Sequence, residues 1–553
     1  MKYLFFLLTI SVWTCSGQNL YLKISGINQT ENKIIDSLSW DKKHVNQKSI
    51  SDEVNLFKNK ITQKGYIDLN FIETKKVNDS VFEYNFSLGK KINFIHAYVG
   101  INSELKSLQI FDSKSDTLVL PFIEIENFLN AGILKLEQKG HALSKLKLKN
   151  IQPFQNILKA ELELVSDKKR GIDDIVINGY DKFPIGFKKN IRNKYKKLIF
   201  NKNNLKYVYN DFNKIRFVKQ LKYPEILFTK DSTKIFVYLE KAKRNNFDGF
   251  VGFSNDENKN LIFNGYVDLE LNNTLNIGEK LAFYWKSDGK NQKTFNISTE
   301  LPYIFKTPLG LKAQLNIFKQ DSIFQNTKTN IDLGYFLDLN SRIYLGYQET
   351  ESNDINNFNS KILSDSKSAF YTSSFEFQEF NIDDFLFPEK INFMFKLGAG
   401  KRNAKTQSNN QFFMAANVDF HYYLNKKNAI RLKSQNYFLK SDNYLTNELT
   451  RFGGINSIRG FNENSLQANV LISLMAEYQY LLSDGLYFHT ITDYAYFQDK
   501  TIEKYGKLLG LGFGFGLQTK NGLFNFVYAN GSSNGQAVKL SNSVVHLSLK
   551  AIF

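Results

Sequence analysis

One stretch of the chain combines a cation with residues that permit unusual backbone turns. In RFGGINSIRGFNENSLQANV (451–470), three glycines interrupt a pattern of alternating apolar and polar residues. The run at its centre consists of Ser457, Ile458, Arg459, Gly460 and Phe461. A guanidinium is a planar fork of donors that suits carboxylates, and glycine permits a close backbone turn. Two interpretations are open: Arg459 is solvated in an exposed loop, or it folds inward to meet carboxylates.

Two other patterns resemble catalytic motifs, but their contexts do not fit. GSSNG (531–535) matches G-x-S-x-G, which requires a strand-turn-helix elbow, whereas here it lies in a polar loop between strand-like runs. GLGFGFG (510–516) has the wrong spacing for a dinucleotide loop, and no helix follows it. The six histidines include no pair at metal-ligand spacing. We therefore expect no enzymatic activity, cofactor or metal.

The composition indicates a membrane barrel rather than a compact enzyme. The chain has 553 residues, a net charge of +18 and 15% aromatic residues, yet a polar mean hydropathy of −0.35. Half of each barrel strand faces water, and aromatic girdles mark the bilayer edges, so this combination is expected there. A basic face on one expected helix (Lys188, Lys189, Arg192, Lys194, Lys196 and Lys197) is interpreted as solvated rather than as a specific binding patch.

The first residues are typical of a secretory signal. Lys2 precedes a short apolar run at 4–13, and small residues precede an expected cleavage after Gly17. The only cysteine, Cys15, lies in this segment, so the mature chain is expected to lack disulfides, thiol catalysis and Cys-type zinc sites. VWTC also permits a lipoprotein interpretation, although Trp13 stands where a small residue is usual. An exported chain argues against nucleic acid as the partner of the positive charge.

Before the alternating region, one small module is repeated. A strand at 20–26, helices at 28–40 and 49–66, and strands at 71–79 and 81–89 give the order β-α-α-β-β. The ending QKGY at Gln63 recurs as QKGH at Gln138, each with a glycine suited to a left-handed position after a helix. A third copy has helices at 184–198 and 205–218, and Pro224 marks the start of its penultimate strand. The expected modules are 18–91, 92–169 and 170–245, after a signal peptide at 1–17.

Residues 246–553 are expected to form a transmembrane barrel of sixteen antiparallel strands, an even number as single-chain barrels require. The expected strands begin near 247, 260, 273, 292, 309, 327, 341, 367, 390, 411, 427, 468, 485, 507, 521 and 544. In LLGLGFGFGL (508–517) the glycines share one face and the large apolar residues share the other, which can meet lipid. The last strand ends in an aromatic residue, Phe553.

The strand count provides carboxylates for Arg459. The loop falls between the eleventh and twelfth strands, and alternation turns Glu477 of the twelfth strand inward. Asp493 of the thirteenth strand points inward in the same way. Phe461 would then fill apolar space beside Arg459.

These features together resemble the outer-membrane insertase superfamily (the bacterial surface antigen family), which includes the BamA and TamA assembly factors and the two-partner secretion transporters. GGINSIRGFNE resembles the V-R-G-F/Y loop between strands eleven and twelve, with Ile458 in place of the usual valine. Glu477 and Asp493 match the acidic residues of strands twelve and thirteen, but Ala495 stands where glycine is usual. The three modules resemble POTRA domains, and Phe553 resembles the C-terminal signal for membrane insertion.

The resemblance implies an outer-membrane protein of a Gram-negative bacterium with POTRA modules in the periplasm. The first hypothesis is an assembly factor that binds unfolded outer-membrane polypeptides by β-augmentation and acts at the barrel seam. The alternative is a two-partner-secretion-type pore that exports a polypeptide through the lumen. Three modules favour an accessory, TamA-like role. Outer-membrane lipid and a periplasmic bridging protein are further partners that the resemblance suggests.

Overall fold

The computed structural model describes residues 19–100, 104–111, 115–255, 261–288, 292–357, 359–381, 384, 386–405, 407–520, 522–534 and 543–553. At 250–255, 261–264 and 552 only the backbone is described. The expected signal peptide at 1–17, with Cys15, lies outside the described residues, as does Gly535 of GSSNG. The chain divides into two compact units, Met1–Gly171 with Ile199–Asn203, and Ile172–Leu198 with Asn204–Phe553.

The first unit contains two small α/β modules. The first module comprises β1 (Leu20–Gly26), α2 (Gln29–Asp36), β2 (Lys43–His44), α3 (Gln47–Gln63), β3 (Asn70–Asn78) and β4 (Val81–Ser87), with sheet order β2-β1-β4-β3. The second comprises β5 (Phe94–Tyr98), α4 (Glu104–Ser107), β6 (Thr117–Pro121), η1 (Phe122–Glu124), α5 (Ile125–Gln138), β7 (Lys145–Phe154) and β8 (Ile157–Val165), with order β6-β5-β8-β7. In both sheets the first long strand runs parallel to the last.

The repeated glycines have the conformation that the sequence predicted. Gly65 follows α3 with φ +102°, and Gly140 follows α5 with φ +96°. Each module has one edge strand, β3 or β7, that comes directly before its last strand, and every residue of β3 is exposed. These edges leave backbone donors and acceptors free for another strand.

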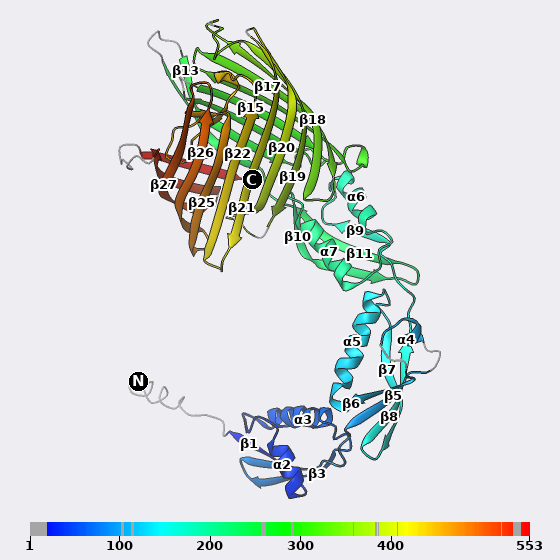
Figure 1. Ribbon diagram of the computed structural model, residues 1–553. Coiled ribbons are helices and arrows are strands. Elements are labelled where there is room, and N and C mark those ends of the chain that lie inside the picture. The colour runs from blue at the N-terminus through cyan, green and yellow to red at the C-terminus, as the bar shows by residue number, and fades with distance from the viewer. Residues whose placement is uncertain are drawn as a thin grey trace, which may run out of the picture. The chain divides into compact units, whose positions relative to one another are not determined.

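The second unit begins with the third module, which Figure 1 shows next to one end of the barrel. It comprises β9 (Asp174–Asn178), α6 (Ile185–Tyr195), α7 (Lys202–Asn213), β10 (Val218–Phe228) and β11 (Thr233–Lys241), with sheet order β10-β11-β9. Burial, and then the hydrogen bond to Asp211, raises the pKa of Tyr195, so its hydroxyl stays protonated and donates to that carboxylate (2.6 Å) between α6 and α7.

Two predictions in this module are wrong. The second helix ends at Asn213, not at 218, and β10 begins at Val218. Pro224 therefore lies inside β10 rather than at its start, at a register shift between Lys222 and Glu225. Proline cannot donate to a ladder, but β10 is an edge strand, where a bulge accommodates it.

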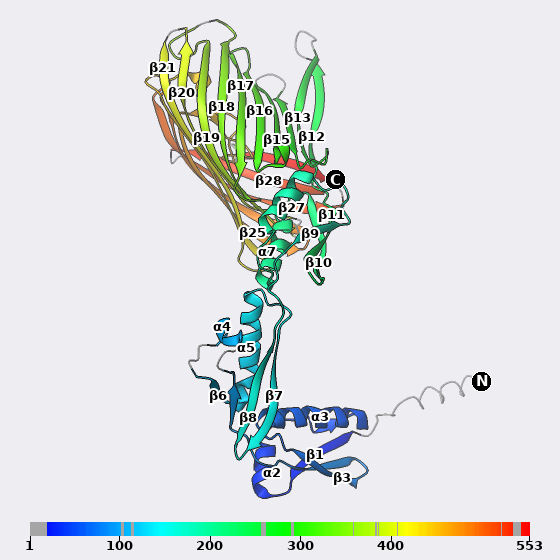
Figure 2. The same cartoon turned by 90° about the vertical axis from the view of Figure 1, so that its right-hand side faces the viewer.

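The barrel is closed and contains sixteen strands, as predicted. In barrel order they are β12 (Asn246–Asn255), β13 (Leu261–Asn272), β14 (Lys280–Asp288), β15 (Gln292–Leu301), β16 (Leu309–Gln320), β17 (Phe324–Phe336), β18 (Ser341–Asp354), β19 (Ser366–Phe380), β20 (Glu389–Ala404), β21 (Ser408–Tyr423), β22 (Asn428–Lys440), β25 (Val470–Ser483), β26 (Leu486–Asp499), β27 (Lys504–Thr519), β28 (Gly522–Ser533) and β29 (Ser543–Ile552). Figure 2 shows β13 to β21 side by side along the wall.

One predicted strand start is clearly wrong. The third barrel strand begins at Lys280, not near 273. Residues 273–279 alternate like a strand, but the Glu279 carboxylate accepts backbone hydrogen bonds from Leu275 (2.6 Å) and Ile277 (3.3 Å) and closes them into a turn. A side chain that bonds its own backbone locally competes with a sheet ladder.

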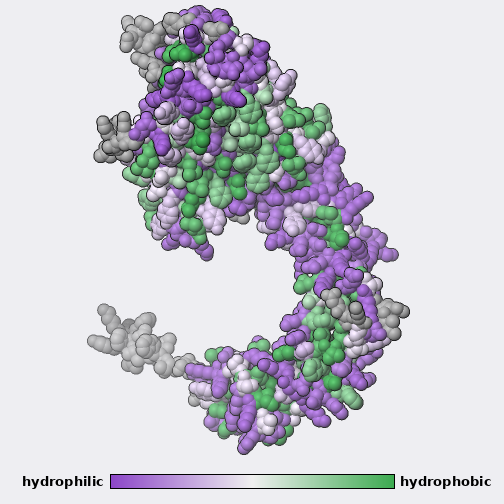
Figure 3. Space-filling view, in the orientation of Figure 1, coloured by the Kyte–Doolittle hydropathy of each residue, from purple (hydrophilic) through white to green (hydrophobic). Residues whose placement is uncertain are grey.

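The outer face of the barrel is apolar. Leu511 and Phe513 of β27 and Val545, Leu547 and Leu549 of β29 are exposed on the outside, as the alternation predicted. Figure 3 shows a hydrophobic band across the strands, bordered by hydrophilic residues. Among the described residues, no helix is both long and apolar enough to cross a membrane.

The barrel closes between its first and last strands through a short contact, the seam. Over the described backbone, β12 and β29 pair at Asn246↔Ile552 and Phe247↔Ala551, whereas β12 pairs with β13 along its whole length. Beside the seam, Asn245 and Phe553 exchange backbone hydrogen bonds (3.2 and 3.0 Å). The register between the two closing strands stops at Phe247.

The outer face can be tested with two adjacent residues of β15. Ile297 is 46% exposed, while Ser298 faces the lumen between Ala282 and Gln314. We expect Ile297→Arg to lower the free energy of unfolding in lipid vesicles by about 2–4 kcal/mol, because lipid does not solvate the charge. Ser298→Arg is the control and should be tolerated. Equal losses in urea titrations of the two variants would contradict this orientation.

Candidate functional site

The loop between β22 and β25 enters the barrel. It contains η3 (Thr446–Glu448) and a short hairpin of β23 (Thr450–Phe452) and β24 (Leu466–Ala468). The tip between these strands carries the three glycines noted in the sequence, Gly453, Gly454 and Gly460, all with φ between +85° and +102°. Residues with side chains rarely adopt this region. The glycines thus give the tip the turns that bring Arg459 to the wall.

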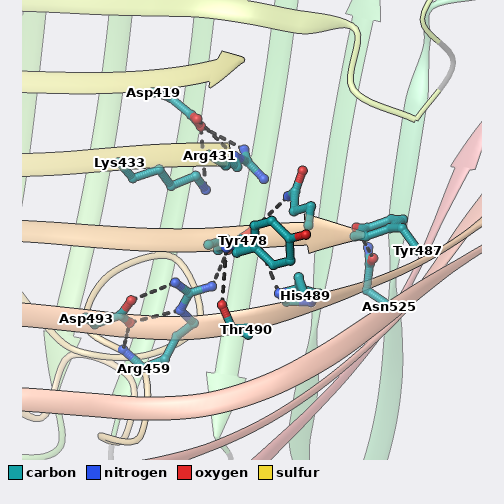
Figure 4. Close-up of polar contacts among 12 residues, drawn as sticks. Asp419, Arg431, Lys433, Arg459, Tyr478, Tyr487, His489, Thr490, Asp493 and Asn525 are labelled. Carbon is teal, nitrogen blue, oxygen red and sulfur yellow. Dashed lines mark hydrogen bonds and ion pairs between the residues drawn. The ribbon is translucent and has the colours of Figure 1, made fainter. Parts of the chain in front are cut away.

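Arg459 is buried and bound to two carboxylates, which favours the inward interpretation. Its Nε and Nη2 donate to Asp493 Oδ2 (2.9 Å) and Oδ1 (2.6 Å), and its backbone N–H donates to Asp493 Oδ2 (2.9 Å). Its Nη1 donates to Glu477 Oε1. The side chain of Arg459 is 6% exposed, and that of Asp493 is fully buried. We call Arg459, Glu477 and Asp493 the lumenal clamp; Figure 4 shows Arg459 reaching Asp493 from the loop.

The strands place the two acids for this contact. Glu477 lies on β25 and Asp493 on the neighbouring β26, and both point inward by the alternation of their strands. Ala495 leaves the register of β26 with β25 unshifted, and its methyl group is fully buried. The substitution of the usual glycine therefore preserves the charge contact.

The clamp belongs to a larger charge network that the sequence analysis missed. Arg431 of β22 binds Asp419 of β21 through two hydrogen bonds (2.9 and 2.7 Å), and Lys433 lies 3.6 Å from the same carboxylate. Arg431 also pairs in register with Glu477. Three cations and three anions thus balance in one wall of the lumen, and Figure 4 labels all of them except Glu477. Charged residues in the middle of strands β21 and β22 were the available signal.

The motif residues beside Arg459 are uncharged, and they contribute packing. Ile458 is fully buried with Phe452, Met475 and Phe497, and Phe461 packs against the same cluster. Ser457 is buried, and its hydroxyl has no partner among the described residues. The apolar cluster excludes water from one side of the clamp, which strengthens its charge contacts.

The glycine stripe of β27 has a steric role. A Cβ at Gly510 would overlap the carbonyl oxygen of Arg459, and one at Gly531 of β28 would overlap that of Gly460. Gly514 and Gly516 likewise make room for the side chains of inward residues of β26. GLGFGFG and GSSNG, which fit no catalytic context, therefore include the surface on which the loop rests.

The stem of the loop has a second anchor. Arg402 of β20 is fully buried, and its Nη1 donates to Glu448 Oε1 (2.7 Å) and to the carbonyl oxygen of Asn443 (3.3 Å). Gln411 of β21 donates to the other oxygen of Glu448 (2.8 Å). The loop is thus tied to β25 and β26 through Arg459 and to β20 and β21 through Glu448.

A second segment enters the lumen from the end of the barrel at which β12 begins, which we call the proximal end. In the turn between β19 and β20, Leu386 and Phe387 are buried against Tyr487 and Leu523. The ring of Phe387 lies 4.3 Å from that of His421. A cavity of about 360 Å³ remains between this turn and the clamp. Both segments occupy the space through which an extended chain would have to pass.

In the part of the chain that the structure describes, no group of three or more His, Cys, Asp or Glu residues could hold a metal ion. The charged side chains of the clamp bind one another.

We expect Arg459→Ala to destabilise the barrel by about 3–5 kcal/mol, because it leaves two buried carboxylates without their cation. Arg459→Lys should cost less, since the charge stays but the fork is lost. The measurement is thermal unfolding of the purified protein, together with complementation in cells. Heat stability and complementation equal to the unchanged protein in both variants would rule out the clamp.

Gly510 and Gly531 form the surface on which the loop rests. A methyl group at either position should displace the loop without changing any charge. We expect Gly510→Ala and Gly531→Ala to expose the loop to protease and lower heat stability. Gly485→Ala is the control, because its Cβ would meet nothing closer than Gln518 Cβ at 3.4 Å. Protease patterns of the two variants that match the control would contradict the steric role.

The comparisons with known proteins bear on the fold. No family model matches the chain, and no curated protein matches it. CdiB from Escherichia coli is similar at 11% identity and a TM-score of 0.50, over 96% of this chain and 100% of that one. CdiB from Acinetobacter baumannii is similar at 14% identity and a TM-score of 0.50, over 84% and 90%. BamA from Haemophilus ducreyi lacking POTRA domains 1–3 is 14% identical with a TM-score of 0.49, over 84% of this chain and 100% of that one. The chain therefore shares the fold of the two CdiB structures, and its α/β modules followed by a closed sixteen-stranded barrel are the architecture that the sequence predicted.

Proposed function

We propose that this protein is an outer-membrane assembly factor of the BamA or TamA type, which helps β-barrel polypeptides to insert and fold. The single observation that carries the proposal is the contrast between the lumen and the seam. The lumen is occupied by the clamped loop and by the β19–β20 turn, while the seam register stops at Phe247. Opening the seam breaks few contacts, whereas emptying the lumen breaks three buried ion pairs, two at Arg459 and one at Arg402.

The modules suit the capture of extended clients. β3, β7 and β10 are edge strands of the three module sheets, and β3 is exposed along its whole length. An extended peptide can add to such an edge by main-chain hydrogen bonds. The proximal end of the barrel then faces the periplasm, where unfolded outer-membrane polypeptides and a bridging protein would meet the modules.

Exposed side chains on the edges add side-chain specificity. Phe71 and Ile72 on β3 and Leu221 and Tyr223 on β10 are about half exposed. Amphipathic strands of barrel proteins present apolar side chains on one face. The edges can therefore select alternating apolar strands over other unfolded segments.

The alternative is a two-partner-secretion-type pore that exports a polypeptide through the lumen. It requires that the loop leave the clamp and that Leu386 and Phe387 leave the proximal mouth. The two routes make opposite demands on the seam, which gives a direct test.

We expect a disulfide across the seam to abolish assembly. Phe247→Cys with Ala551→Cys joins residues that lie directly opposite each other, a geometry that a disulfide tolerates. The matched control, Leu315→Cys with Thr329→Cys, joins β16 to β17, away from the seam. The readouts are the outer-membrane proteome and the secretome of cells that depend on each variant, with and without reductant.

Loss of barrel proteins from the outer membrane under oxidation, restored by reductant and absent in the control, supports the assembly factor. Normal outer-membrane and secreted proteins with the seam locked would overturn it. A seam lock that leaves both the outer membrane and the secretome unchanged is the result that the export pore predicts.

A further inference from the structure

Two turns at the proximal end of the barrel hold α6 of the third module. The ring of Phe187 lies 4.6 Å from that of Tyr303 in the β15–β16 turn. Asn190 donates to the carbonyl oxygen of Thr307 in the same turn (3.4 Å). Phe187 also packs so closely on Gly278 of the β13–β14 turn that a Cβ there would overlap its ring. Figure 1 shows α6 beside the edge of the barrel.

Both turns direct apolar side chains into solvent. In the β13–β14 turn, Leu275 is 62% exposed and Ile277 is 50% exposed, while the buried Glu279 closes the backbone behind them. In the β15–β16 turn, which contains η2 (Ile304–Lys306), Phe305 is 88% exposed. Large exposed apolar side chains gathered at one place mark an interaction surface.

The backbone of the second turn is strained in a way that exposes Phe305. Tyr303, Phe305 and Lys306 have φ values of 54°, 54° and 60°, a region that bulky residues rarely adopt. Strain of this kind persists only where the surrounding structure enforces it, and it gathers at functional positions. Here the packing of Tyr303 under α6 fixes the turn, and the strain turns Phe305 away from the protein.

Exposed cations lie next to Phe305 and Phe187 in the chain. The first residue of α6, Ile185, is 63% exposed, and Lys188 and Lys189 of the same helix are exposed. Lys306 is exposed next to Phe305. Together, Ile185, Lys188, Lys189, Leu275, Ile277, Phe305 and Lys306 form a surface that we call the rim patch. The lysines of α6, interpreted from the sequence as merely solvated, thus lie beside an apolar surface.

We infer that the rim patch rests on the phospholipid surface of the membrane leaflet at the proximal end. Three observations favour lipid over a protein partner. The β15–β16 turn directly follows β15, whose Ile297 is 46% exposed on the outer face of the barrel. Three of the four apolar side chains of the patch, Leu275, Ile277 and Phe305, come from barrel turns, which end at the bilayer boundary. Its lysines suit phosphate headgroups, as on helices that lie in the membrane interface.

Lipid contact at the rim patch would position the third module, whether a client leaves through the seam or through the lumen. Lipid contact through α6 fixes the module at the membrane surface, so that its edge strand β10 is presented beside the bilayer. The packing of Phe187 between the two turns makes this position rigid. A client strand bound to β10 would therefore be delivered at the boundary between water and lipid.

Tryptophan quenching in nanodiscs tests this inference with the full-length protein. Trp13, Trp40 and Trp285 are replaced by phenylalanine, and single tryptophans are introduced by Phe305→Trp, Ile277→Trp or Tyr207→Trp. Tyr207 of α7 is an equally aromatic, 57% exposed control in the same module. The nanodiscs contain phosphatidylethanolamine and phosphatidylglycerol with brominated or unbrominated acyl chains.

We expect brominated lipid to quench most of the emission of the tryptophans at 305 and 277 and to leave that at 207 unchanged. Folding of each variant's barrel is checked by heat-modifiability. If brominated lipid does not change the emission at 305 and 277 in folded variants, the inference is overturned.

The role of the lysines is tested in the Ile185→Trp variant. Lys188→Glu with Lys189→Glu should reduce its quenching in phosphatidylglycerol-containing discs, while the charge-matched control Lys206→Glu with Lys230→Glu should not. Quenching that stays equal in both double variants would overturn the charge contribution.

Discussion

A buried guanidinium cannot remain in a barrel without carboxylates to pair with it, and this constraint organises the molecule. Arg459 sits in a part of the lumen where apolar residues such as Ile458 and Met475 exclude water. Asp493 receives three of its hydrogen bonds and Glu477 one. Removing either partner leaves a charge in a medium that does not solvate it. The position of the loop is therefore tied to two neighbouring strands, and Arg431 and Lys433 extend that tie to β21 and β22.

The clamp also depends on the absence of side chains. Arg459 and Gly460 approach β27 and β28 so closely that Gly510 and Gly531 leave no room for a methyl group. β28 is the neighbour of β29, the last strand of the seam. The loop thus contacts β28, one strand away from the seam between β29 and β12. This contact gives a physical route by which the loop and the seam influence each other.

The energies of the two possible client routes differ in kind. A backbone hydrogen bond contributes about 1 kcal/mol net, and the described seam register is only two residue pairs long. A buried ion pair that loses one partner costs about 3–5 kcal/mol, and the loop has two such anchors, at Arg459 and at Arg402. The balance supports the lateral route of the proposed function. The lipid contact inferred for α6 would place the nearest client-binding edge at the same boundary.

Alternation and turn chemistry were enough to predict the barrel, the loop and its two acids, because a strand repeats every two residues and each inward position follows from its neighbours. They failed where a side chain overrode the pattern. Glu279 turned an alternating segment into a turn, and the bulge at Pro224 let β10 continue through a residue that usually ends a strand. Alternation could also show that Arg431 and Arg402 are charged residues within strands, but not what they contact, and it says nothing of Phe387, which lies in a turn.

By itself, the sequence determined which residues face inward, where the loop falls in the strand order, and that Arg459 had carboxylates within reach. The tertiary structure decided that Arg459 binds both acids, that the glycines of β27 and β28 serve as its bed, and that the lysines of α6 lie beside exposed apolar turns. The reason is that periodicity is local along a strand, whereas these contacts join strands, turns and a helix that only barrel closure brings together.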